Sequence, residues 1–156
     1  MTIDELKYYA EGGCSSQQYF LAAAIYGDPN YPNRRLEAYK WVVISKWMGD
    51  AMATDCVLDF IYWGLTSDEK KRAFDLVDEW WEEKFSLAHD EDVDPESLDW
   101  HKALQDKTGL TERKTKIKLE QEKLSRDELN QLMNRYVREI KASYGGLPVD
   151  DLDKEY

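Results

Sequence analysis

The chain has 156 residues, enough for one domain with a sizeable hydrophobic core. Its 21 basic and 32 acidic side chains give a formal net charge of −11, which argues against binding to nucleic acid or to an anionic membrane surface. No stretch of about 18 apolar residues occurs, so we expect no transmembrane helix. The first residues lack a signal peptide, and Cys14 and Cys56 have no motif spacing, so we expect a cytoplasmic protein with free thiols.

Apolar residues recur with helical spacing between a few Gly and Pro residues, which predicts an all-α fold. We expect Gly49 to cap the third helix. Capping boxes at Thr66–Glu69 and Ser125–Glu128 should begin the fifth and the last helix. We assign residues 1–147 to a single all-α domain and residues 148–156 to a flexible tail. The expected helices cover about residues 3–11, 15–26, 33–48, 51–63, 66–87, 96–105, 112–123 and 125–144.

The third expected helix, which contains the stretch EAYKWVVISKWMGD at 37–50, has apolar residues on all sides of its axis. A helix of this kind is covered on several sides. We therefore expect an inner helix that packs on its own partner and on the next helix pair. Its tryptophans, Trp41 and Trp47, are then part of the scaffold rather than of a binding site.

Part of the sequence repeats with a period near 35 residues. Glu37-Ala38 recurs 35 positions later as Arg72-Ala73. A period of this length with two helices per unit is typical of an α-solenoid. Four further residues recur 36 positions later: Leu21, Ala22, Ile25 and Tyr26 become Val57, Leu58, Ile61 and Tyr62.

Several short strings of residues 15–85 form one pattern: Leu21-Ala22, Tyr26, the turn at 28–33, the string Glu37-Ala38-Tyr39-Lys40-Trp41, and Gly49-Asp50-Ala51. With this pattern the stretch resembles the Sel-one-like repeat, a relative of the tetratricopeptide repeat. Where that family usually has Ala-Ala before a closing Gly, this chain has the larger residues of the string ISKWM at 44–48, so the helix packing at this point departs from the family pattern. The resemblance implies a short α-solenoid of two helix pairs over residues 15–87, with the helices of 96–145 packing as a cap.

The sequence contains no pattern typical of catalysis or metal binding. It has no HExxH, GxSxG, P-loop or CxxC motif. The stretch HDEDVDPE lacks the central Gly and the Glu spacing of a calcium loop. We interpret His89, Asp90, Asp92 and Asp94 as part of a solvated acidic loop, and we expect a non-enzymatic protein with no metal and no cofactor.

Most of the negative charge lies in one segment. Residues 66–106 hold 5 basic and 14 acidic side chains, a net charge of −9, whereas residues 107–147 have a net charge of +4. Either the basic segment neutralises the acidic one within the chain, or the acidic segment is a docking surface that attracts a basic partner. The candidate partner-binding carboxylates are Asp75, Asp78, Glu79, Glu82, Glu83, Asp90, Asp92, Asp94, Glu96 and Asp99.

Two adjacent tryptophans lie within the acidic segment. Trp80 and Trp81 should point about 100° apart on a helix. We expect one in the core and the other at a helix junction or exposed, and we include Trp81 as an aromatic anchor for the partner.

Stacked helix pairs bind other proteins on extended surfaces, so we expect a protein-binding module. A small, acidic, aromatic-rich chain that resembles Sel-one-like repeats is also similar to bacterial immunity proteins. That similarity implies a cytoplasmic protein that occludes a basic antibacterial toxin. The alternative is a general scaffold or regulatory adaptor of the Sel-one-like type. The sequence leaves the oligomeric state open.

Overall fold

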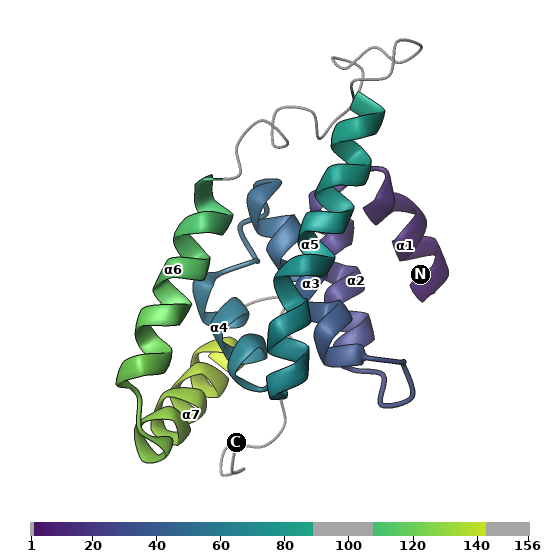
Figure 1. Cartoon of the computed structure of the whole chain (residues 1–156). Coiled ribbons are helices and arrows are strands. Elements are labelled where there is room, and N and C mark those ends of the chain that lie inside the picture. Colours follow the sequence, from purple (N-terminus) through teal and green to yellow (C-terminus); the bar gives the residue numbers. More distant parts are fainter. Residues whose placement is uncertain (1, 89–107, 143–156) are drawn as a thin grey trace.

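The computed structural model describes residues 2–88 and 108–142, which form helices joined by turns (Figure 1). These two ranges contain no β-strand, so the prediction of an all-α fold is confirmed for them. The predicted helix at 96–105, part of the predicted cap and the predicted tail at 148–156 lie outside the described residues. The helices are α1 (Ile3–Glu11), α2 (Ser15–Tyr26), α3 (Arg34–Trp47), α4 (Asp55–Trp63), α5 (Ser67–Ala88), α6 (Thr108–Lys123) and α7 (Arg126–Ala142).

Helix α3 lies in the interior of the fold and contacts α2, α4 and α5. None of its side chains is exposed, and those of Trp41, Val42 and Ile44 are almost completely buried. The prediction of an inner helix covered on several sides is therefore confirmed. Trp47 is half-buried against the same core, so both tryptophans of α3 are packing residues.

Helices α2 and α4 bury the residues that the repeat aligned, including Leu21 with Val57 and Ile25 with Ile61, except Tyr26, which is half-buried. Their neighbours differ, however. Helix α2 packs against α1 and α3, whereas α4 packs against α7 and α3. Helix α7 thus joins the fold at α4, with Met133, Val137 and Ile140 on its buried side. No described helix is both long and apolar enough to cross a lipid bilayer.

Helix α3 ends and helix α5 begins at the capping residues predicted from the sequence, and local hydrogen bonds stabilise both termini. Gly49 follows α3 in the left-handed region, with φ of 97°, and its N–H donates to the carbonyl oxygen of Lys46. Thr66 Oγ1 accepts from the Glu69 N–H at 3.2 Å, and Glu69 Oε1 accepts from the Thr66 N–H at 2.9 Å. The capping box of α5 is therefore confirmed in both directions.

Helix α4 begins at Asp55 rather than near residue 51. Asp50 Oδ1 accepts from the Met52 N–H at 2.8 Å, which holds the intervening residues in a turn. Thr54 Oγ1 then accepts from the Val57 N–H at 3.4 Å and caps the shorter helix.

Helix α6 begins at Thr108 instead of near residue 112. Gly109 lies outside the predicted range of 112–123. A glycine inside a helix costs only about 1 kcal/mol relative to alanine, and the first turn of α6 includes it.

Candidate functional site

The predicted carboxylates of α5 share one face of that helix, opposite the face that packs on the core. They recur at three- and four-residue spacing, which places them along one side of the helix. Asp78 is half-buried, and the other carboxylates of this face are exposed. We call this set the α5 acidic face: Asp75, Asp78, Glu79, Glu82 and Glu83.

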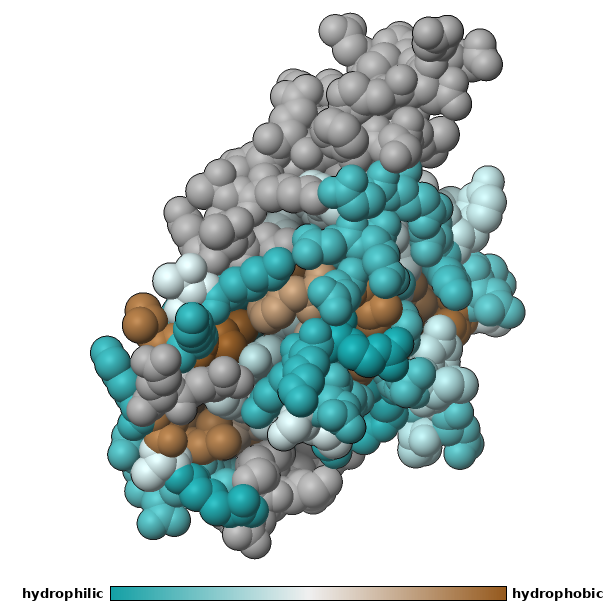
Figure 2. Space-filling view, viewed as in Figure 1, coloured by the Kyte–Doolittle hydropathy of each residue, from teal (hydrophilic) through white to brown (hydrophobic). Residues whose placement is uncertain are grey.

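The α5 acidic face looks outward because other helices cover the remaining sides of α5. In Figure 1, α5 lies at the front, between α6 and α1, with α3 behind it. Hydrophilic residues follow the front of α5 in the space-filling view (Figure 2). The other predicted carboxylates, Asp90, Asp92, Asp94, Glu96 and Asp99, lie outside the described residues.

Cations of the same chain neutralise part of the α5 acidic face. Lys114 Nζ on α6 lies 3.3 Å from Asp78 Oδ2, and Lys84 Nζ lies 4.0 Å from Glu83 Oε1. Asp75 and Glu79, by contrast, form no ion pair with any residue of 2–88 or 108–142. Neutralisation within the chain and a remaining negative surface therefore coexist on this face.

Trp81 is not an exposed anchor, which corrects the prediction from sequence. Its side chain is 1% exposed and that of Trp80 is 4% exposed, so both adjacent tryptophans are buried. The reason is that α5 is covered on more than one side. Helix α3 packs against it, α6 reaches it through Lys114, and Glu11 of α1 accepts from Trp80 Nε1 at 3.2 Å.

Exposed aromatic residues occur on α1, which the sequence interpretation did not single out. Tyr8 is 77% exposed and Tyr9 is 48% exposed, and their ring centroids lie 5.4 Å apart in an edge-to-face arrangement. The signal was available in the sequence, because Leu6 and Ala10 mark the buried side of α1 and Tyr8 lies opposite them.

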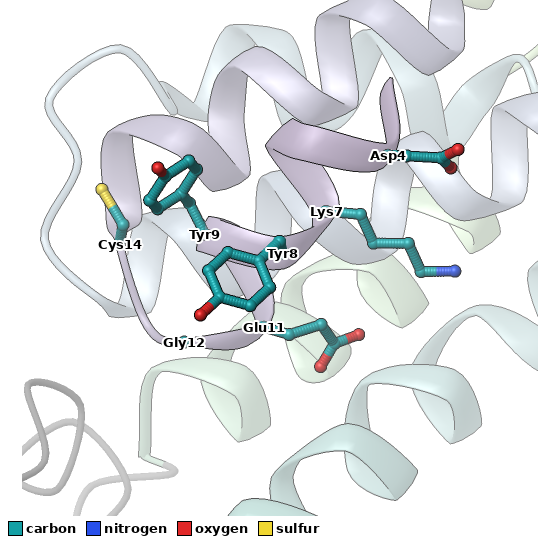
Figure 3. A pocket seen from close by; sticks show the side chains of 7 residues that line it. All are labelled: Asp4, Lys7, Tyr8, Tyr9, Glu11, Gly12 and Cys14. Atoms are coloured by element: carbon teal, nitrogen blue, oxygen red, sulfur yellow. The ribbon is translucent and has the colours of Figure 1, made fainter. Parts of the chain in front are cut away.

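The two tyrosines line a pocket of about 610 Å³ at the C-terminal end of α1. Figure 3 shows their rings between Cys14 and Glu11, while the side chains of Lys7 and Asp4 extend away from the rings. Glu11 joins this pocket to α5, because its Oε2 also lies 3.2 Å from Lys84 Nζ. The pocket and the α5 acidic face are thus neighbouring parts of one surface. The complete lining is Asp4, Lys7, Tyr8, Tyr9, Glu11, Gly12 and Cys14.

A buried polar cluster links the four helices α3, α4, α6 and α7. Arg113 Nη1 donates to Asp59 Oδ1 at 2.9 Å, and Arg113 Nε donates to the Tyr39 hydroxyl at 2.8 Å. The Tyr136 hydroxyl donates to Asp59 Oδ2 at 3.3 Å. All four side chains are buried, so the cluster holds α3, α4, α6 and α7 together and does not face a partner. The hint in the sequence was Asp59 itself, a single charge in the apolar stretch VLDFIYW.

Burial governs protonation within this cluster. It raises the pKa of Tyr39 to about 12, in spite of the opposing effect of the Arg113 guanidinium. Burial, together with the Asp59 carboxylate, also raises the pKa of Tyr136. Burial alone would lower the pKa of Arg113, but Tyr39 and Asp59 outweigh it and the net shift is upward. The cluster therefore contains a charged Arg113 and neutral tyrosines at neutral pH.

Within the described ranges, no group of three or more His, Cys, Asp or Glu side chains is placed to hold a metal ion. His89 and His101 lie outside these ranges. Comparison with known protein families, with curated proteins and with solved structures gives no match for this chain. The function is accordingly inferred from the residues and their geometry.

Proposed function

We propose that this protein is a non-enzymatic binding module that docks a basic protein on the α5 acidic face. The observation that supports the proposal is the row of carboxylates on the outer side of α5, in which Asp75 and Glu79 have no ion-pair partner among the described residues. Exposed charges of this kind gain little from intramolecular pairs. They attract an oppositely charged partner over a distance near the Debye length and raise the association rate.

The resemblance to Sel-one-like repeats favours one form of this function, a cytoplasmic immunity protein that neutralises a basic antibacterial toxin. In that role the α5 acidic face would cover the cationic surface with which the toxin approaches its substrate. A solenoid-like stack formed by α2–α3 and α4–α5, capped by α6 and α7, would hold α5 rigidly for docking. A scaffold or regulatory adaptor is the alternative, and it would use the same face.

The test is to reverse two charges on the α5 acidic face and to measure binding to a purified basic partner. The product of the gene beside this one is the first partner to test. We expect Glu79→Lys with Glu82→Lys to lower the association rate constant by about tenfold at low salt, and to flatten its dependence on ionic strength.

The matched control is Asp127→Lys with Glu139→Lys on α7, which changes the net charge by the same amount at exposed positions away from α5. If both double variants slow association equally, the α5 acidic face is not the docking site. Circular dichroism of each variant checks that the helices are retained.

A further inference from the structure

Tyr8 and Tyr9 are exposed, and unlike Tyr26 and Trp63 they have no cation of the described residues over their rings. Elsewhere the chain places its own cations over aromatic rings: Arg34 lies 5.1 Å from the Tyr26 centroid, and Lys70 lies 4.9 Å from the Trp63 centroid. No Lys or Arg of the described ranges lies over Tyr8 or Tyr9, which contact each other edge to face. The electron-rich faces of these two exposed rings are therefore unoccupied within the described part of the chain.

The neighbourhood of these rings favours a cation as the occupant. Glu11 borders the rings (Figure 3), and its carboxylate ties α1 to Lys84 and Trp80 of α5. Lys84 also lies near a second carboxylate, that of Glu83, which is exposed and belongs to the α5 acidic face. Lys7 belongs to the pocket lining, but its side chain extends away from the tyrosine rings (Figure 3). A basic protein docked on the α5 acidic face would bring its own cations to this pocket.

We propose that the pocket beside Tyr8 and Tyr9 receives an arginine side chain of the basic protein partner, an inference that rests on the proposed function. A guanidinium is planar and weakly hydrated, so it stacks on a tyrosine ring while its N–H groups donate to a carboxylate. Glu11 lies next to the Tyr8 ring in Figure 3, but its carboxylate is directed away from the rings, and its Oε2 is already shared with Lys84 and Trp80. A pocket of about 610 Å³ has room for such a side chain.

The test uses peptide probes on the intact protein and does not need the partner. The probe is acetyl-Gly-Arg-Gly-amide, and its neutral isostere has citrulline in place of arginine. Two-dimensional NMR follows the ring protons of Tyr8 and Tyr9 during titration. We expect saturable shifts with the arginine peptide and none with the citrulline peptide. We also expect Tyr8→Leu to weaken the binding by about two- to fivefold.

Tyr8→Leu keeps a good helix former at an exposed position, so the variant should fold normally. The matched control is Leu119→Ala, which removes a 51% exposed apolar side chain from α6 and should leave the titration unchanged. Equal shifts with the citrulline peptide, or unaltered binding by Tyr8→Leu, would overturn the proposal. Tighter binding of acetyl-Gly-Phe-Gly-amide would overturn it in favour of an apolar occupant.

This readout separates the pocket from the proposed function. If Glu79→Lys with Glu82→Lys slows partner binding but the arginine peptide does not shift Tyr8 and Tyr9, the pocket inference alone is wrong. If the peptide shifts both tyrosines but charge reversal leaves partner binding unchanged, the pocket binds a guanidinium and the α5 acidic face is not the docking site.

Discussion

Arg113 on α6 donates to Asp59 on α4 at 2.9 Å, although 54 positions separate the two residues in the chain. Their side chains are only 4% and 5% exposed, so this is a buried ion pair. Removing one member leaves the other charge buried without compensation, which typically destabilises a protein by about 3–5 kcal/mol. We expect Asp59→Leu to lower the free energy of unfolding by about this amount, measured by urea denaturation.

Replacing the whole polar cluster should be milder than replacing Asp59 alone. Buried ion pairs exchanged for apolar residues of similar volume are often neutral in stability. Arg113 Nη2 is already buried without a hydrogen-bond partner among the described residues, so the pairing is incomplete. A variant combining Asp59→Leu and Arg113→Met with Tyr39→Phe and Tyr136→Phe should therefore be more stable than Asp59→Leu. A quadruple variant less stable than the single one would contradict this account.

The Asp59–Arg113 pair also shows what could not be predicted from sequence. The C-terminal end of α3 and the start of α5 depend on hydrogen bonds between residues three or four positions apart, as at Thr66 and Glu69. Both were predicted correctly. The buried pair depends on how α4 and α6 meet, which periodicity within one helix does not reveal. The burial of Trp81 has the same origin, because it requires knowing that several helices surround α5.

The start of α4 was misjudged for a local reason. Ala51 and Met52 are good helix formers, and the predicted helix included them. The side chains of Asp50 and Thr54 instead form hydrogen bonds with nearby backbone N–H groups, which outweigh that propensity. For the candidate site, the carboxylates of α5 were predicted, whereas the exposed tyrosines of α1 were missed, although Leu6 and Ala10 mark the opposite side of that helix as buried.

Trp81 should affect folding rather than the docking surface. It is 1% exposed, and truncation of a buried tryptophan to alanine costs about 3–5 kcal/mol. We expect Trp81→Ala to shift the urea midpoint strongly downward. The comparison variant is Tyr8→Ala, which removes a side chain that is 77% exposed and should change the free energy of unfolding by about 0.5 kcal/mol or less. Similar effects of both changes would show that Trp81 is not a core residue.

Gly49 and Gly64 both follow helices but should respond differently to alanine. Gly49 has φ of 97°, where an L-residue is strained, although an added Cβ would meet no atom within 4 Å. Gly64 has φ of −82°, and its added Cβ would make ordinary contacts. We expect Gly49→Ala to lower the free energy of unfolding by about 1 kcal/mol or more, and Gly64→Ala to be nearly neutral. The reverse order in urea denaturation would contradict the assigned backbone conformation.

Alkaline pH should destabilise the fold through Tyr39. Burial raises the pKa of this hydroxyl from 10.0 to about 12. Between these values the unfolded chain has lost the proton while the folded chain retains it, so the unfolded state binds fewer protons and stability falls as pH rises. The contribution is complete below pH 10 and is lost as pH rises through about 12. Urea denaturation across this range should show a decline of about 1.4 kcal/mol per pH unit from Tyr39.

The control for this decline is Tyr39→Phe, which removes the titrating hydroxyl and keeps the ring. Its pH profile should be shallower between pH 10 and 12 than that of the wild type. Some slope should remain, because burial also raises the pKa of Tyr136, and raises that of Cys56 from 9.0 to about 12. Parallel profiles for wild type and Tyr39→Phe would mean that Tyr39 ionises equally in the folded and unfolded states, which its complete burial beside Arg113 argues against.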